Sequence, residues 1–372
     1  MLRRKTRFVC VSDTHGYAPS EAGFRLPPGD VLIHAGDLTN QGSKSELQRT
    51  MNWIAAADYE VKIVICGNHD ITLDEAFYAE NKDRFHNKHP EDYQECMDVV
   101  TSASPSILFL KHQSALVRLN KANGPNTVFK VFGSPYSQCD GNWAFLYGSG
   151  EAEKLWRPIP LDTDILVTHM PPHGHCDKIS GEPMGCRALH RNLNRVRPLL
   201  AVCGHIHESR GFERVRWRSG PLLSETTEAE SLEDEVIKGI LPPVGSKKQS
   251  LVDLTGKKAP RLDNEGLAGN TNTNTSPSTP FPPSVKFLVL PPQSHTEEQA
   301  TGFSSQPRPT EAQGTEAERL RAQRKETCIV NAAIMLSGWP HRGGRRFYPG
   351  PIIVDLELPA WTEDSVTHQG QA

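Results

Sequence analysis

Short apolar runs alternate with polar stretches along much of this chain, and several of the runs are rich in β-branched residues. The clearest are Arg7 to Ser12, Val31 to Ala35 and Val61 to Ile65. Apolar runs of this length, bounded by polar residues or glycine, are typical of buried strands. The same pattern predicts two later strands, Asp164 to Thr168 and Leu199 to Cys203.

Between the second and third of these runs, the spacing of apolar residues changes to that of a helix. Ser43 stands just before this stretch, and Glu46 follows three residues later, which is the spacing of a capping box. Strand, helix and strand then form a βαβ unit, in which the two strands must be parallel. Further helices are expected within Asp92 to Ser102 and across Gly185 to Val196.

Three short apolar runs, Ile107 to Leu110, Ala115 to Leu119 and Thr127 to Phe132, are separated by turn residues. They predict antiparallel strands of a second sheet. Two more strands are expected near the end of the chain, within Thr327 to Ile334 and at Ile352 to Leu356. The pattern as a whole predicts an α/β protein.

The composition changes between about Ser224 and Glu326, where Glu, Ser, Thr, Asn, Pro and Lys dominate. Such a segment cannot bury enough apolar area to offset the entropy lost on ordering, so we expect it to be largely disordered. Strands flank it, and long insertions cost little closure entropy. We therefore predict a core at 1–223, an insertion at 224–326, closing strands of the same core at 327–358 and a polar tail at 359–372. Val285 to Leu290 is either a lone strand or a docking motif.

Five predicted strands end in polar side chains, which are poor core material and good site material. Because open α/β sheets place their sites at the carboxyl ends of strands, we expect these side chains to share one crevice. They are Asp13, His15, Asp37, Asn68, His69, Asp70, His169, His205 and His207.

The set without His69 and Asp70 holds two carboxylates, one amide oxygen and four imidazoles. This exceeds what one ion needs and suits two borderline ions, with Mn²⁺ expected and Fe or Zn²⁺ as alternatives. A metal pair acidifies a water and clamps the oxygens of a displacement at phosphorus. His69 can supply the proton for the leaving group if Asp70 or another carboxylate keeps its imidazole protonated.

Other polar or aromatic residues near these strand ends can each be interpreted in two ways. His173, His175 and Asp177 follow His169 on a loop and are either substrate contacts or bystanders. Trp143 either stacks on a base or packs. Two further residues remain open in the same way: Arg187 reaches a phosphate or solvates a helix start, and His34, inside a strand, is better interpreted as packed than as a ligand.

The order of these motifs resembles the calcineurin-like metallophosphoesterase superfamily, over Thr6 to Arg218 and the two final strands. The resemblance implies a four-layer αββα sandwich with two mixed sheets. It also implies one metal held by Asp13, His15 and His207, a second held by Asn68, His169 and His205, a bridge at Asp37 and a proton donor at His69.

Within that superfamily, Gly185-Cys186, Arg195 to Pro198 and Gly204 to Glu208 are most similar to the MPPED (metallophosphoesterase-domain-containing) proteins. Those proteins are similar to class III cyclic-nucleotide phosphodiesterases. The resemblance implies a phosphodiesterase acting on a small nucleotide-like ester, such as a cyclic nucleotide. The alternatives are a phosphomonoesterase, including a protein phosphatase, and a non-catalytic scaffold.

The formal net charge of −3 gives no electrostatic case for nucleic-acid binding. The eight cysteines are scattered, which is typical of reduced thiols, and no apolar segment is long enough to span a bilayer. We expect a cytoplasmic protein with a small-molecule phosphoester substrate and no membrane partner, and a nuclear location is left open. A protein partner is expected, if anywhere, through 224–326.

Overall fold

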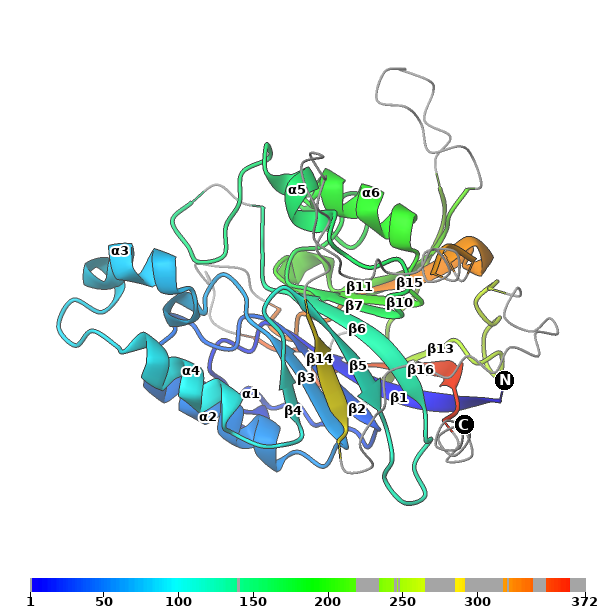
Figure 1. Cartoon of the computed structure of the whole chain (residues 1–372), viewed down its shortest axis with the longest axis horizontal. Helices are drawn as coiled ribbons and strands as arrows, with labels where there is room; N and C mark the ends of the chain where they lie inside the picture. Colours follow the sequence, from blue (N-terminus) through cyan, green and yellow to red (C-terminus); the bar gives the residue numbers. More distant parts are fainter. Residues whose placement is uncertain are drawn as a thin grey trace, which may run out of the picture.

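The computed structural model describes residues 2–138, 141–218, 234–243, 246, 248–264, 285–291, 317–319, 321–336 and 346–361. In this part of the chain, two large sheets lie face to face, and helices cover the outer face of each sheet (Figure 1). The expected αββα sandwich with two mixed sheets is confirmed. Among the described residues, no helix combines the length and the apolar character needed to cross a membrane.

The first sheet has the strand order β13-β16-β1-β2-β3-β4. Strands β1 to β4 are parallel, β16 is antiparallel to β1, and β13 is parallel to β16. The bounds are β1 (Arg3–Val11), β2 (Val31–Ala35), β3 (Val61–Ile65), β4 (Ile107–Phe109), β13 (Ser250–Asp253) and β16 (Ile352–Pro359).

The second sheet has the order β12-β11-β15-β10-β7-β6-β5-β14, with a parallel centre of β15, β10, β7 and β6 and antiparallel strands outside it. Its strands are β5 (Gln113–Arg118), β6 (Val128–Ser134), β7 (Ile165–Thr168), β10 (Leu200–Cys203), β11 (Gly211–Arg216), β12 (Glu235–Lys238), β14 (Phe287–Leu290) and β15 (Glu326–Asn331). A small hairpin, β8 (Lys178–Ile179) and β9 (Glu182–Pro183), stands apart from both sheets.

Helices lie at the three places where the sequence predicts them, and the structure adds others that it does not predict. Ser43 caps the second helix, and its hydroxyl accepts a hydrogen bond from the backbone of Glu46, so the predicted capping box is confirmed. The helices are α1 (Pro19–Ala22), α2 (Lys44–Ala56), α3 (Glu75–Phe85), α4 (Tyr93–Thr101), α5 (Ala152–Trp156) and α6 (Arg187–Val196), with 3₁₀ turns η1 (Ile71–Leu73) and η2 (His207–Ser209).

The apolar core lies in three layers, and β1 shows why. Successive side chains of a strand point to opposite faces, so Phe8 and Cys10 enter the core between the two sheets. Val9 and Val11 enter a second core, against α2 and α4. A third core lies between the second sheet and helices α5 and α6. Strands buried on both faces read as continuous apolar runs, which is why they stand out in the sequence.

One strand lies in the other sheet from the one expected. The run Ile107 to Leu110 was predicted to pair in an antiparallel second sheet, but β4 pairs parallel with β3 in the first sheet. The physical reason is the crossover through α3 and α4, which returns the chain in the direction of β3. The sequence did not reveal α3, because Tyr78 is its only buried residue and it has no apolar stripe.

The insertion predicted at 224–326 contributes strands to both sheets. Strand β13 extends the first sheet, and β12 and β14 form the two edges of the second. The expectation of disorder is therefore wrong for these strands. The strand reading of Val285 to Leu290 is confirmed, since β14 pairs with β5. The low-complexity pieces at 270–275 and 280–283 lie outside the described residues, and the tail is described only to residue 361.

Candidate metal centre

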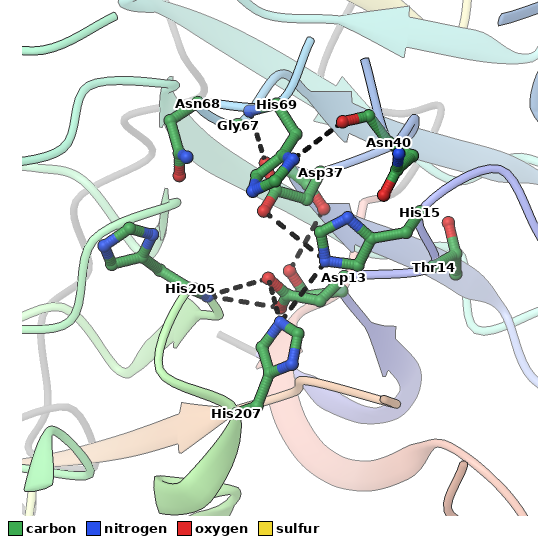
Figure 2. Close-up of polar contacts among 12 residues, drawn as sticks. Asp13, Thr14, His15, Asp37, Asn40, Gly67, Asn68, His69, His205 and His207 are labelled. Carbon is green, nitrogen blue, oxygen red and sulfur yellow. Dashed lines mark hydrogen bonds and ion pairs between the residues drawn. The ribbon is translucent and has the colours of Figure 1, made fainter. Parts of the chain in front are cut away.

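The polar strand ends meet in one place between the two sheets. Strands β1, β2 and β3 of the first sheet and β7 and β10 of the second end at this site, which brings together residues far apart in the sequence (Figure 2). Eight of the nine predicted site residues are at most 6% exposed, with Asp70 fully buried among them, and His205 is partly exposed. The structure therefore gathers the predicted set in a largely buried cluster.

One group consists of Asp13, His15 and His207. The Nε2 atom of His207 lies 3.3 Å from Oδ1 of Asp13 and 3.3 Å from Nε2 of His15. Figure 2 shows the three side chains pointing toward one another. All three are buried, and their ligand atoms lie within 4.8 Å of one another, so the group can hold a metal ion.

The carboxylate of Asp37 lies between this group and a second one. Its Oδ2 atom is 3.7 Å from Nε2 of His15, and its Oδ1 atom is 3.3 Å from Nε2 of His169. The same His169 atom is 3.1 Å from Oδ1 of Asn68. Asp37 therefore has one oxygen on each side, as a bridging carboxylate requires.

His205 joins the second group by its ring and the first by its backbone. Its ring centroid lies 5.1 Å from that of His169. Its backbone N–H donates to the carboxylate of Asp13, at 3.0 Å from Oδ1. The loop after β10 is thus fastened to the loop after β1, which holds the two sheets in register at the site.

A hydrogen bond fixes the tautomer of His169. Its Nδ1 atom lies 2.8 Å from the backbone carbonyl of Ala35. A carbonyl only accepts, so Nδ1 carries a hydrogen, and Nε2 is the atom that can bind a metal when its own proton is displaced. This is the protonation that a metal-ligating imidazole needs.

The donor distances fit shared ions. Two donors bonded to one ion at about 2.0–2.2 Å lie roughly 3 to 3.5 Å apart. The N–O and N–N separations of 3.1 and 3.3 Å in both groups are in this range, and only the 3.7 Å between His15 and Asp37 is longer. The donor set, oxygen and nitrogen without thiolate, also suits divalent ions such as Mn²⁺, Fe²⁺ and Zn²⁺.

Two side chains of the cluster, Asp13 and His169, are held in their charged forms by their neighbours. Burial alone would raise the pKa of Asp13, but the neighbouring His207 outweighs it and lowers that pKa to about 2. Burial likewise opposes charge on His169, yet Asp37 and Asp13 raise its pKa to about 9. Carboxylates that draw a proton onto a buried imidazole will also attract a cation, which can replace that proton.

Several site residues hold strained backbone conformations. Asp13, His15, Asp37 and His205 have φ between 47° and 65°, a region that residues other than glycine rarely adopt. Such strain persists where the surrounding structure overdetermines it, and it concentrates at functional sites. Gly67 approaches the Asp37 carboxylate so closely that a Cβ there would overlap Oδ1. The turn after β3 therefore requires glycine.

His69 is held by the backbone of the loop after β2. Its Nδ1 atom lies 2.8 Å from the carbonyl oxygen of Asn40, and its backbone N–H donates to Oδ1 of Asp37 at 2.9 Å. Its ring also meets the ring of His15 edge-on, with centroids 4.7 Å apart. No sequence pattern pointed to Asn40, because a backbone carbonyl is common to every residue type.

The expected partnership of Asp70 with the His69 imidazole is wrong. The Asp70 carboxylate accepts hydrogen bonds from the backbone N–H groups of Leu38, Thr39 and Gly67 and from the Thr39 hydroxyl, at 2.7 to 3.1 Å. Asp70 thus ties the loop after β2 to the loop after β3. These four donors, and not a donor on the His69 ring, hold the Asp70 carboxylate, which makes Asp70 a positioning residue.

The residues that the sequence left open lie in different surroundings. His34 is buried in β2 with its Nε2 atom 2.9 Å from the Thr14 hydroxyl, as expected of a packed histidine. His175 lies 3.0 Å from Glu213, and Asp177 accepts two backbone hydrogen bonds within its own loop. Arg187 is exposed at the first position of α6. Trp143, by contrast, contacts His69.

The family model described as calcineurin-like phosphoesterase matches residues 6–209, which span these strand ends. The chain belongs to the calcineurin-like phosphoesterase family. Among curated relatives, human "Metallophosphoesterase domain-containing protein 1" is 38% identical over 218 residues, covering 55% of this chain and 62% of that protein. A UPF0046 protein of Caenorhabditis elegans is 32% identical over 209 residues, with 55% and 64% covered.

Another relative has a name that does not refer to phosphoesters. A protein of Emericella nidulans, "Probable rhamnogalacturonate lyase C", is 42% identical over 223 residues, which make up 58% of this chain but 19% of that protein. This chain spans less than two thirds of the length of each of these three relatives. The similarity to that protein therefore covers 58% of this chain and 19% of the other.

Proposed function

We propose that this protein is a phosphoester hydrolase that uses two divalent metal ions, and that its substrates are small nucleotide-like phosphodiesters, with cyclic nucleotides among the candidates. The observation that carries the proposal is the position of Asp37, with one carboxylate oxygen toward His15 and the other toward His169. Family membership supports the same chemistry.

The proposed ligands follow the two groups described above. Asp13, His15 and His207 would hold one ion, Asn68, His169 and His205 the other, and Asp37 would bridge them. Bound ions would supply Lewis acidity for attack of water on phosphorus, with Mn²⁺ proposed first and Fe or Zn²⁺ as alternatives. Apart from the ligands, the chain must orient the ester and give a proton to the oxygen that leaves.

We assign that proton to His69. The hydrogen bond to Asn40 fixes Nδ1 as a donor, so Nε2 is the atom that exchanges a proton with the ester. Asp37 accepts from the backbone N–H of His69, which places the proposed acid next to the proposed bridge. An alkoxide is a poor leaving group, so a diester gains from this acid.

The charge of the cluster favours a diester over a monoester. None of the nine residues gathered at the site is Arg or Lys, the residues that best complement a dianionic phosphomonoester. A phosphodiester carries a single negative charge and needs less compensation. Preference for para-nitrophenyl phosphate over bis-para-nitrophenyl phosphate would overturn the diester proposal and favour the phosphomonoesterase alternative.

The deciding experiment measures hydrolysis of bis-para-nitrophenyl phosphate by the purified protein with Mn²⁺, Fe²⁺ or Zn²⁺, beside Asp37→Asn. We expect activity that needs the ion and falls by at least about 100-fold in the variant, because the bridge is lost. Metal content of both proteins is measured in parallel. Wild-type protein that is inactive with every ion would overturn the proposal and favour a scaffold that binds a partner through 224–326.

A further inference from the structure

Trp143 lies against the ring of His69. Trp143 belongs to the segment between β6 and α5. The two ring centroids are 4.1 Å apart, and the ring planes are inclined by 33°. Trp143 is only partly exposed. The proposed proton donor therefore has an indole on one face of its ring, from a segment that ends no predicted strand.

The backbone around Trp143 is fastened to the site. The N–H of Ala144 donates to the carbonyl of Asn68 at 3.2 Å, directly beside His69. The N–H of Phe145 donates to the carboxylate of Asp74 at 2.8 Å, at the start of α3. Ala144 and Phe145 are both buried in the core between the first sheet and its helices. Trp143 is thus held at a fixed height over the imidazole.

The His69 ring needs such a support. Its hydrogen bond to the Asn40 carbonyl sets the position of Nδ1, but one hydrogen bond does not by itself set the plane of the ring. His15 meets the ring edge-on at 4.7 Å. An indole stacked on the face opposes tilting, because the ring cannot rotate without losing that contact.

We propose that Trp143 is a positioning residue for the proposed proton donor: it keeps the His69 imidazole in the plane in which Nε2 points at the leaving oxygen. This inference rests on the proposed function, since it assumes that His69 donates a proton. It differs from simple packing in its consequence. If Trp143 only packs, its removal should lower the stability of the protein. If it positions His69, its removal should lower activity only on esters whose leaving group must receive a proton.

The test compares Trp143→Ala and Trp143→Phe with wild type on diesters of poor and good leaving groups. For Trp143→Ala we expect kcat on the poor leaving group to fall about 10- to 100-fold, because a proton donor displaced by about 1 Å loses that much. KM, metal content and kcat on the good leaving group should change less than about threefold. Trp143→Phe retains an aromatic face and should recover most of the activity.

A double variant identifies the route of the effect. If Trp143 acts through His69, adding Trp143→Ala to His69→Ala costs nothing further. If Trp143→Ala lowers kcat equally in wild type and in His69→Ala, the inference is overturned. Loss of bound metal from Trp143→Ala would also overturn it. Trp361→Ala is the matched control: that indole is also partly exposed, but it covers Arg118 at 4.3 Å, near the start of β1 and far from the site.

A spectroscopic readout separates this inference from the proposed function. The indole ring current should shift the ring protons of His69 upfield in the Zn²⁺-loaded protein, and Trp143→Ala should remove the shift while Trp361→Ala keeps it. Unchanged His69 signals in Trp143→Ala would overturn the inference. If wild-type protein hydrolyses no ester, the proposed function fails, and the spectrum still decides whether the indole of Trp143 lies against the imidazole in solution.

Discussion

The Nδ1 atom of His69 lies 2.8 Å from the backbone carbonyl oxygen of Asn40. This contact replaces the carboxylate partner that the neighbouring Asp70 offered in the sequence. A neutral carbonyl fixes the tautomer and direction of the ring without adding a negative charge beside two carboxylates that already lie close by. The loop after β2 therefore controls the side chain that ends β3.

Removing the His69 imidazole tests its role as the acid. We expect His69→Ala to lower turnover of a diester with a poor leaving group by roughly 10²–10⁴-fold, the usual contribution of general-acid catalysis. The loss should shrink as the leaving group improves, because a good leaving group needs no proton. Metal content is measured on the same samples. Loss of metal would show that His69 is a ligand instead.

Glu46 offers a test of the loop that positions His69. Its carboxylate accepts hydrogen bonds from the backbone N–H groups of Asn40, Gln41 and Ser43 at 3.0 to 3.3 Å. We expect Glu46→Ala to reduce kcat about tenfold on poor leaving groups, because the Asn40 carbonyl loses its support, and to lower the free energy of unfolding by about 1 kcal/mol.

Glu21→Ala is the control for that variant, since Glu21 accepts the same kind of hydrogen bond from the backbone of Ala18, just before α1, and does not hold the Asn40 loop. Glu21→Ala should leave kcat within about twofold of wild type. A similar fall in kcat for both variants would contradict a specific role of Glu46 at His69.

Asp70 is expected to act on stability more than on chemistry. Asp70→Ala leaves three buried backbone N–H groups without their acceptor, and each such loss costs about 1–3 kcal/mol. The Thr39 hydroxyl retains the backbone carbonyl of His69 as an acceptor at 3.2 Å. We expect the free energy of unfolding, measured in urea, to fall by at least about 3 kcal/mol. Asp98→Ala, at an exposed carboxylate, should cost less than about 0.5 kcal/mol. Comparable stability of the two variants would refute the assignment.

A histidine away from the candidate metal ligands gives a prediction of pH dependence. Burial lowers the pKa of His112 to about 4, and its ring lies against Phe132 and Tyr136. Between this value and the ordinary 6.5, the unfolded chain binds the proton more tightly than the folded one. His112 therefore makes the free energy of unfolding fall as the pH drops from 6.5 toward 4, by no more than about 3 kcal/mol.

The measurement is urea unfolding of wild type and His112→Asn at pH 7 and pH 5. Asparagine suits the positive φ of 59° at this position and removes the titrating group. We expect a smaller loss of stability at pH 5 in the variant than in wild type, while His89→Asn, at an exposed site, should behave as wild type. Equal pH dependence of all three proteins would exclude His112 as the source.

Some relationships were accessible from the sequence because they are local. Buried parallel strands are continuous apolar runs, so β2 and β3 match their predicted bounds. Parallel strands bring their carboxyl ends to one edge, and a crevice containing Asp37, His169 and His207 followed from that rule alone. The capping box of α2 is equally local, since its two residues are one helical turn apart.

The sequence by itself thus determined the α/β class and the residue types at the site, through periodicity and the direction of parallel strands. The tertiary structure alone decided that β4 belongs to the first sheet and that segments of the insertion complete both sheets. It also decided that His69 contacts Asn40 and Trp143. The contact with Asn40 uses a backbone carbonyl, which every residue type has. The other relationships pair segments that are distant in the sequence, and no local pattern encodes such pairings.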